Sequence, residues 1–481
     1  MTLIPLIIDG RECPAADGSS FERRDPVTGE VASRAAAAKP ADVRTAVAAA
    51  EAAFRSWSET GPGERRRLLL RAADLLEARE EEFAAAMLTE TGATRMWAGF
   101  NVHLAAGVLR EAAALTTQIT GDVIPSDKPG ILSLAVRRAA GVVLGIAPWN
   151  APVILAVRAI ATPLACGNTV ILRSSELCPA THHLVGHILN EAGFPPGVVT
   201  VLSNAPADAP AVVEALIAHP AVRRVNFTGS TGVGRIIARL AAEHLKPALL
   251  ELGGKAPLIV LDDADLDQAV DAAIFGAFMN QGQICMSTDR FIVDEAVADG
   301  FVAKLAERAG GLSAGDPRGP VLLGSLIDPA AADRMETLIT DAVGKGAQLA
   351  VGGRRSGSVV TPTILDHVRP GMLVYGEESF GPVKPVIRAK DTEDAIRIAN
   401  DTPYGLSAAV FSRNTQRAMA VAQRLDTGIC HINGPTVADE PQMPFGGVKA
   451  SGYGRFGGKA AIDAFTELRW ITIEGPQPYP F

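Results

Sequence analysis

The segment NQGQICMSTDR (280–290) contains the most reactive candidate in the chain, Cys285. A cysteine thiolate is a strong nucleophile, whereas most free cysteines are small apolar side chains that fill a protein core. The chain has five cysteines, and none belongs to a CxxC pair or to a His/Cys group with zinc-site spacing. Cys285 is therefore either a nucleophile or a core residue, and we expect no metal site.

A carboxylate occupies an unusual place in the segment LELGGKAP (250–257), where Glu251 follows an apolar run and precedes two glycines. Such a carboxylate either belongs to an ion pair or is desolvated, which raises its pKa and suits it to act as a base. Neighbouring glycines admit close approach by a ligand. Glu251 is thus a candidate general base, with an ion-pair network as the alternative.

Two further segments place polar groups at expected strand ends. APWN (147–150) ends with Asn150, which is either a turn-forming residue or an amide donor to a developing oxyanion. FTGSTGVG (227–234) follows a strand and opens a helix, so its glycines would let backbone N–H groups face a phosphate. Its spacing differs from GxGxxG, and an ordinary glycine-rich turn is an equal alternative.

The elements around these segments predict an α/β protein. Short β-branched runs alternate with helical stretches, which is typical of a parallel sheet with crossover helices. The runs cover residues 141–147, 168–173, 198–202, 222–227, 247–254 and 256–263. A helix predicted over 266–278 ends just before the Cys285 segment, so the cysteine is expected on a loop that enters the next strand.

Other segments predict two N-terminal helices and two isolated β elements. Apolar residues at helical spacing indicate a helix over 43–57, and a charge-rich helix is expected over 64–88. Residues 121–140 are typical of a projecting hairpin, and residues 460–481 of a helix followed by a strand. Neither has an obvious local partner, and unpaired strand edges are a liability, so we expect pairing across a subunit boundary.

Composition limits the remaining possibilities. A chain of 481 residues is long enough for two or three domains, and its net charge of −8 argues against nucleic acid or an anionic membrane as a partner. The scattered cysteines favour a reducing compartment. The apolar N-terminus lacks the preceding basic region of a signal peptide. The near-apolar run 139–149 is only about half as long as a membrane-spanning helix. We therefore expect a cytoplasmic protein.

Six segments in this order resemble the aldehyde dehydrogenase superfamily over essentially the whole chain. They are APWN, FTGS, ELGGK, GQIC, EESFGPV (377–383) and PFGGVKASGYGR (444–455). The sequence around Arg158 is similar to the aromatic-aldehyde branch, which contains salicylaldehyde, vanillin and benzaldehyde dehydrogenases. The resemblance implies a homodimer or homotetramer.

The resemblance also implies a fold. We expect an aldehyde-dehydrogenase-like α/β architecture with a Rossmann-like cofactor domain (1–120 and 141–250) and an αβ catalytic domain (251–440). Residues 121–140 and 460–481 would form a small β oligomerisation flap.

The resemblance assigns roles to individual residues. Cys285 corresponds to the nucleophile, Glu251 to the general base and Asn150 to the oxyanion donor, in a reaction that passes through a thioester. The expected cofactor-binding residues are Ile146, Trp149, Arg173, Glu176, Gly229, Ser230, Glu378 and Phe380. An acid at Glu176 favours NAD. The family usually has KP(S/A)E where this chain has RSSE (173–176), so NADP is not excluded.

Substrate preference is less directly implied. Arg158 occupies a pocket position that is often aromatic in the family, and a guanidinium there could bind a ring hydroxyl or a carboxylate. The alternatives are an ordinary salt bridge and, for the function, a semialdehyde or aliphatic aldehyde dehydrogenase or a catalytically silent relative. The expected pocket residues are Trp97, Arg158, Ile284, Met286, Phe445 and Tyr453, although methionines and aromatic residues are more often plain core.

Overall fold

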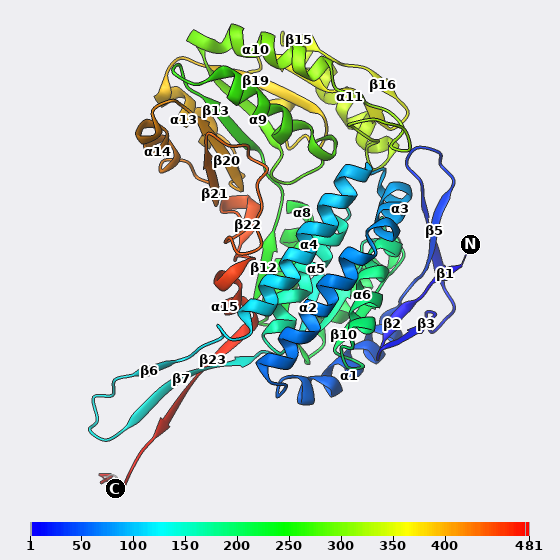
Figure 1. The fold of residues 1–481 in the computed structure, drawn as a ribbon, viewed down its shortest axis with the longest axis vertical. Coiled ribbons are helices and arrows are strands. Elements are labelled where there is room, and N and C mark those ends of the chain that lie inside the picture. Colours follow the sequence, from blue (N-terminus) through cyan, green and yellow to red (C-terminus); the bar gives the residue numbers. More distant parts are fainter. Residues whose placement is uncertain (1, 477, 481) are drawn as a thin grey trace.

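The computed structural model describes residues 2–476 and 478–480. Two large sheets, each covered by helices, form the body of the molecule, and a small sheet projects from it (Figure 1). The α/β architecture predicted from the sequence is confirmed. Two minor sheets complete the fold. They contain β1 (Leu3–Ile4), β4 (Ser20–Arg24) and β5 (Val31–Ala36) in one, and β16 (Arg355–Ser356) and β17 (Val359–Val360) in the other.

The first large sheet has eight strands in the order β22-β12-β11-β8-β9-β10-β2-β3. Their bounds are β2 Leu6–Ile8, β3 Arg11–Cys13, β8 Val142–Ile146, β9 Thr169–Arg173, β10 Val199–Leu202, β11 Val222–Thr228, β12 Ala248–Glu251 and β22 Gly452–Tyr453. The central strands β12, β11, β8, β9 and β10 are parallel. Helices bury both faces of such a sheet, which explains why its strands are continuous apolar runs.

Helices from the first half of the chain cover this sheet. They are α1 (Pro40–Trp57), α2 (Pro62–Ala78), α3 (Glu80–Thr91), α4 (Arg95–Leu115), α5 (Pro152–Ala165), α6 (Pro179–Ala192), α7 (Ala209–Ala218) and α8 (Thr231–Glu243), with the short η1 (Pro206–Asp208).

The helix expected over 43–57 is confirmed as part of α1. The single helix expected over 64–88 is wrong, because Arg79 leaves helical geometry with φ −109° and ψ 24°. This break places three glutamates in the first turn of α3, where they complement the helix dipole.

The second large sheet has seven strands in the order β15-β18-β19-β14-β13-β20-β21. The strands are β13 (Ala256–Val260), β14 (Thr288–Asp294), β15 (Gln348–Val351), β18 (Thr363–Asp366), β19 (Val383–Ala389), β20 (Ser407–Phe411) and β21 (Ile429–Ile432). The helices of this part are α9 (Leu266–Phe278), α10 (Glu295–Gly310), α11 (Pro329–Gly344), α12 (Leu373–Gly376), α13 (Thr392–Asn400) and α14 (Thr415–Ala422). The helix predicted over 266–278 is confirmed. Cys285 follows it, on the loop between η2 (Met279–Gly282) and β14.

The projecting sheet contains β6 (Asp122–Ile124), β7 (Leu132–Ala139) and β23 (Thr466–Ile473), and we call it the flap (Figure 1). The predicted hairpin is confirmed. The terminal strand, however, has a partner in its own chain, since β23 pairs antiparallel with β7 along its whole length. The two elements that have no obvious local partner in the sequence thus pair with each other. Their pairing joins residues too far apart in sequence for local patterns to reveal, and pairing across a subunit boundary stays a prediction.

Three short elements lead the chain from the second sheet back to the flap. They are η3 (Lys449–Ser451), η4 (Gly458–Ala461) and α15 (Ile462–Phe465). On this path β22 joins the edge of the first sheet, next to β12. The C-terminal segment therefore contacts both large sheets before it ends in the flap. Within the described ranges, no helix is long and apolar enough to cross a membrane.

Candidate active site

The loop that carries Cys285 is held by a tight left-handed turn. Asn280, Gln281 and Gly282 have φ values of 47°, 57° and 76°. The side-chain amides of Gln281 and Gln283 form hydrogen bonds of 3.0 Å with backbone groups of residues 324–327. The polar side chains of the NQGQ segment (280–283) therefore fix the loop, so Cys285 lies on a rigid part of the backbone.

Cys285 lies where two cavities meet. The first, which we call the apolar cavity, has a volume of about 270 Å³. The second, the sheet-edge cavity, has a volume of about 240 Å³ and lies against the carboxyl ends of β8, β11 and β12. Cys285 and Asn150 line both cavities. A thiol in this position can contact one ligand from each side.

Glu251 lies at the end of β12 with 1% of its surface exposed, and it lines the sheet-edge cavity together with Cys285. Neither carboxylate oxygen has a hydrogen-bond partner among the described residues. Burial raises the pKa of Glu251 to about 8, and the positive charge of Arg158 opposes this shift. The structure therefore agrees with the desolvated alternative for this carboxylate rather than with an ion-pair network.

The thiol of Cys285 also has a raised pKa. Burial is the main cause, and the negative charges of Glu251 and Glu378 add to it, while Arg158 opposes the shift. The resting side chain is accordingly a protonated thiol. A base that accepts its proton is needed before the sulfur can attack, and a carboxyl group with a pKa of about 8 is suited to that task.

Asn150 is held in place by its backbone and side chain. Its backbone carbonyl oxygen accepts hydrogen bonds from Trp97 Nε1 at 2.9 Å and from Asn280 Nδ2 at 3.0 Å. Its side-chain nitrogen donates to the carbonyl oxygen of Gln283 at 3.1 Å. An amide nitrogen has two N–H groups, so one remains for an oxyanion beside Cys285.

The sheet-edge cavity has features that suit a dinucleotide. Gly229 and Ser230 lie at the start of α8, where backbone N–H groups and the helix dipole favour a phosphate. Trp149 and Phe380 meet edge to face with ring centroids 5.8 Å apart, and both line the cavity. These groups fit the pyrophosphate and the nicotinamide of NAD(P).

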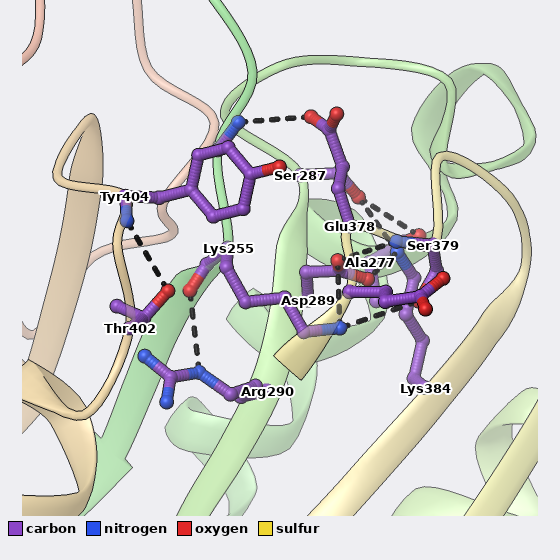
Figure 2. A network of polar contacts seen from close by, with 12 residues as sticks. Lys255, Ala277, Ser287, Asp289, Arg290, Glu378, Ser379, Lys384, Thr402 and Tyr404 are labelled. Carbon is purple, nitrogen blue, oxygen red and sulfur yellow. Dashed lines mark hydrogen bonds and ion pairs between the residues drawn. The ribbon is translucent and has the colours of Figure 1, made fainter. Parts of the chain in front are cut away.

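Glu378 supplies a second carboxylate to this cavity, besides Glu251. Its Oε1 accepts a hydrogen bond from the backbone nitrogen of Gly254 at 2.9 Å (Figure 2), and burial raises its pKa to about 7. Below it, Lys255 and Lys384 share Asp289, with N–O distances of 2.9 and 3.4 Å. Asp289 also accepts from the backbone nitrogen of Ser379, next to Glu378. This buried network fixes the segment that presents Glu378.

Three predicted cofactor residues lie beside the sheet-edge cavity rather than on its wall. Ile146 and Arg173 end the neighbouring strands β8 and β9 and are register partners. Arg173 forms an ion pair with Glu176 at 2.9 Å and donates to Asn204 Oδ1 at 2.9 Å. The carboxyl ends of these strands would continue the site towards the adenosine half of a dinucleotide.

The apolar cavity gathers most of the predicted pocket residues. Trp97, Arg158, Ile284, Met286 and Phe445 line it. Tyr453 does not, and its expected place in the pocket is wrong. It lies on β22, paired with β12 beside Leu250, and 50% of its surface is exposed.

Sequence reasoning missed several wall residues of the apolar cavity. The missed residues include Phe100, Leu104, Ile154, Leu155, Phe275 and Met279. Helical spacing was the available signal, because residues three, four or seven positions apart share a helix face. Phe100 and Leu104 follow Trp97 at such spacing on α4, and the pair Ile154 and Leu155 precedes Arg158 on α5.

Arg158 is anchored within the apolar cavity. Its guanidinium forms an ion pair with Asp439 and lies over the ring of Phe445, 4.4 Å from the centroid. The side chains of Arg158 and Asp439 are 7% and 8% exposed. The salt-bridge alternative therefore describes a real contact, but the contact lies in the wall of the cavity rather than on the protein surface. No cluster of potential metal ligands occurs in the described parts of the chain.

Comparisons with known proteins agree with this geometry. Residues 14–471 match the Aldehyde dehydrogenase family. The chain belongs to this family. It is 64% identical to a vanillin dehydrogenase of Pseudomonas sp. (strain HR199 / DSM 7063) over 99% of both chains. It is 51% identical to a salicylaldehyde dehydrogenase of Pseudomonas putida, again over 99% of both.

Solved structures give the same result. The crystal structure of a salicylaldehyde dehydrogenase from Pseudomonas putida G7 complexed with salicylaldehyde superimposes with a TM-score of 0.98 over 100% of both chains, at 51% identity. The family and the fold predicted from motif order are therefore confirmed. The enzyme is an NAD(P)-dependent oxidoreductase that acts on aldehydes.

Proposed function

We propose that this enzyme oxidises an aromatic aldehyde to its carboxylic acid through a thiohemiacetal and a thioester on Cys285. The observation that supports this most directly is the position of Cys285, where the apolar cavity meets the sheet-edge cavity. An aldehyde in the first cavity and a nicotinamide in the second would both contact the sulfur. The names of the vanillin and salicylaldehyde dehydrogenases that resemble this chain agree with an aromatic substrate.

The first step requires a proton transfer and a bond to carbon. Glu251 accepts the thiol proton of Cys285, and the thiolate attacks the aldehyde carbon. Negative charge then develops on the aldehyde oxygen. The free N–H of Asn150 and the backbone N–H of Cys285 stabilise this oxyanion, each by about 3–4 kcal/mol.

The second and third steps leave the acid as product. A bound NAD(P) would supply the hydride acceptor, so the hydrogen on the former aldehyde carbon would leave the Cys285 adduct with its bonding electron pair, and a thioester on Cys285 would remain. Glu378 would bind ribose hydroxyls of the nicotinamide half, and Trp149 and Phe380 would border its ring and orient it towards the sulfur. After Glu251 has released the thiol proton to solvent, it takes a proton from the water that cleaves the thioester. It then returns this proton to the leaving sulfur, so Cys285 is again a thiol that is ready for the next cycle.

The cofactor is proposed to be NAD rather than NADP. Glu176 places a negative charge where the ribose of the adenosine half would lie, and it would repel a 2′-phosphate. Arg173 is the cation that could compensate, but it already pairs with Glu176 and with Asn204. A 2′-phosphate would have to break these contacts.

The shape of the apolar cavity supports a substrate with a single ring. Its volume of about 270 Å³ lies just below the range typical of drug-sized ligands. Aromatic and aliphatic side chains form most of its wall, which suits a flat apolar ring. A short semialdehyde would leave much of this apolar surface without a partner.

An aldehyde panel with both cofactors tests the proposal. We expect benzaldehyde derivatives to have a higher kcat/KM than succinic semialdehyde or short aliphatic aldehydes, and NAD to be used better than NADP. A preference for succinic semialdehyde would instead assign Arg158 to a substrate carboxylate. Absence of NADH formation with every aldehyde would contradict the proposed activity.

We also propose that the enzyme is a cytoplasmic homo-oligomer, either a dimer or a tetramer, assembled through the flap. Apolar side chains of the flap are exposed in the single chain, including Val123, Leu132, Leu468, Trp470 and Ile473. Exposed apolar clusters of this kind mark protein–protein contacts. Free cysteines in the described chain agree with a reducing compartment.

A further inference from the structure

Asp439 is a charged side chain in the wall of an otherwise largely apolar cavity. It lies on the loop that follows β21, and its side chain is 8% exposed. Its Oδ2 accepts the hydrogen bond from Arg158. Its second oxygen, Oδ1, accepts no hydrogen bond from any described residue. A carboxylate in the wall of a largely apolar cavity loses part of its hydration and is stabilised by a hydrogen-bond donor.

Arg158 keeps this carboxylate in one orientation. The guanidinium is itself fixed, because it is packed over Phe445 and emerges from α5, whose residues are all buried. An ion pair with one fixed member and one free oxygen is a preorganised acceptor. A ligand in the apolar cavity that carries a hydroxyl would supply a donor for this oxygen.

We propose that Asp439 selects aryl aldehydes that carry a ring hydroxyl, by accepting a hydrogen bond from that hydroxyl. This rests on the proposed function, since the aldehyde must first enter the apolar cavity. Asn150 and Cys285 act at the aldehyde end of the substrate, so Asp439 and Arg158 are the buried polar side chains left for the ring. Glu440, the other carboxylate of the wall, is exposed to solvent.

The expected selectivity follows from the cost of an unpaired charge. An aldehyde without a hydroxyl fills the cavity, displaces water from Asp439 and leaves the carboxylate without its donor. Loss of a hydrogen bond to a charged group corresponds to about tenfold to a hundredfold in kcat/KM. A methoxy group cannot donate, so it should not replace the hydroxyl.

The test compares benzaldehyde with its 2-, 3- and 4-hydroxy and its matching methoxy derivatives, in wild type and in Asp439→Asn. We expect the wild-type enzyme to favour the hydroxyl at one ring position over both hydrogen and methoxy by at least about tenfold. In Asp439→Asn this ratio should fall to within about threefold of unity. The ratio is measured within one preparation, so it does not depend on the fraction of folded enzyme.

Two further variants separate selectivity from stability. Asp366→Asn breaks a comparable Asp–Arg pair with Arg388 (2.7 Å), and Asp366 lines neither cavity, so the hydroxyl ratio should stay at its wild-type value. If Asp439→Asn does not fold, Arg158→Met combined with Asp439→Leu replaces the whole pair with apolar groups, a change that buried ion pairs often tolerate. The hydroxyl preference should also be lost there.

The outcomes distinguish the two proposals. A wild-type enzyme that oxidises no benzaldehyde derivative refutes the proposed function. A wild-type enzyme that oxidises benzaldehyde and its hydroxy derivatives equally well, or an Asp439→Asn variant that keeps the wild-type preference, refutes only the role of Asp439. Equal rates with hydroxy and methoxy substrates would show that the cavity recognises size rather than a donor.

Discussion

At the scale of residues, the proposed chemistry depends on two groups that are both protonated at rest. Burial raises the pKa of Glu251 to about 8 and raises the pKa of Cys285 as well. A carboxylate exposed to water, with its ordinary pKa, would be a poor base for a thiol. The same burial that disfavours its charge makes it a stronger proton acceptor once it has ionised.

The pH dependence of the reaction follows from Glu251. Its carboxylate form is scarce below pH 8 and dominant above it, so kcat/KM should rise with pH through an apparent pKa near 8. Glu251→Gln should remove this rise of kcat/KM with pH and lower kcat/KM by about 10²–10⁴-fold. A pH–rate profile of both proteins measures this effect. A wild-type profile that is flat around pH 8 would show that Glu251 is not the general base.

The raised pKa of Glu251 also predicts how the stability of the protein depends on pH. Because the folded pKa of about 8 exceeds the ordinary value of 4.5, the stability that protonated Glu251 contributes is lost as the pH rises through 8. Glu251→Gln cannot ionise and avoids this loss. Thermal unfolding at about pH 9 should therefore show a higher Tm for the variant than for the wild type, with no such gain at about pH 5.

Cys285→Ala should abolish aldehyde oxidation and leave NAD binding intact, because the thiol supplies the bond to carbon but not the binding of the dinucleotide. Activity is measured as NADH formation, and binding by fluorescence titration or calorimetry with NAD. Cys430→Ala is the matched control, since Cys430 lies on β21 and lines neither cavity. Turnover that survives in the Cys285 variant would refute its assignment as nucleophile.

At the scale of elements, the site depends on loops whose backbones pack closely against one another. The left-handed turn at 280–282 brings Gly282 against the segment that carries Glu378 and Phe380. A Cβ atom on Gly282 would lie 2.4 Å from the carbonyl oxygen of Gly381. The turn thus sets the position of Cys285 relative to Glu378 and Phe380, and its geometry needs a glycine.

Gly282→Ala tests this coupling. The φ of +76° and the clash with Gly381 should displace the loop, lower the free energy of unfolding by more than about 1 kcal/mol and reduce kcat. Gly344→Ala is the control, because a Cβ there meets open space at the end of α11. Thermal unfolding and steady-state kinetics compare the two. A Gly282 variant as active and stable as the Gly344 variant would show that the close approach is unimportant.

At the scale of the whole molecule, the flap joins segments from the middle and the end of the chain. β23 pairs with β7, and the side chains after Thr466 are exposed along the strand. Trp470 is 75% exposed although it donates a hydrogen bond to Ser133. A strand of this kind is an open edge, and a second copy of the chain would cover it.

Deletion of residues 468–481 should therefore disrupt assembly. The truncated chain loses most of β23 and leaves β7 as a new, poorly paired strand. Light scattering should show a smaller mass than that of the full-length protein. Trp470→Glu is a milder variant that keeps the sheet but places a charge on its exposed surface. Unchanged mass in both variants would contradict assembly through the flap.

The sequence by itself determined the family, the parallel sheet and the helix that leads to Cys285. These follow from motifs of consecutive residues and from local periodicity, which depend on a few neighbouring side chains. Cys285, Glu251 and Asn150 became candidates in this way because each stands out from the apolar or glycine-rich residues beside it.

Only the tertiary structure decided which side chains share a cavity and which strands share an edge. The pairing of β23 with β7, the contact between Arg158 and Asp439, and the exposure of Tyr453 each depend on residues that are distant in sequence. Packing and burial bring such residues together, and no local pattern encodes them. The break at Arg79 is a smaller example, since a charge-rich helix can continue or end there according to what packs against it.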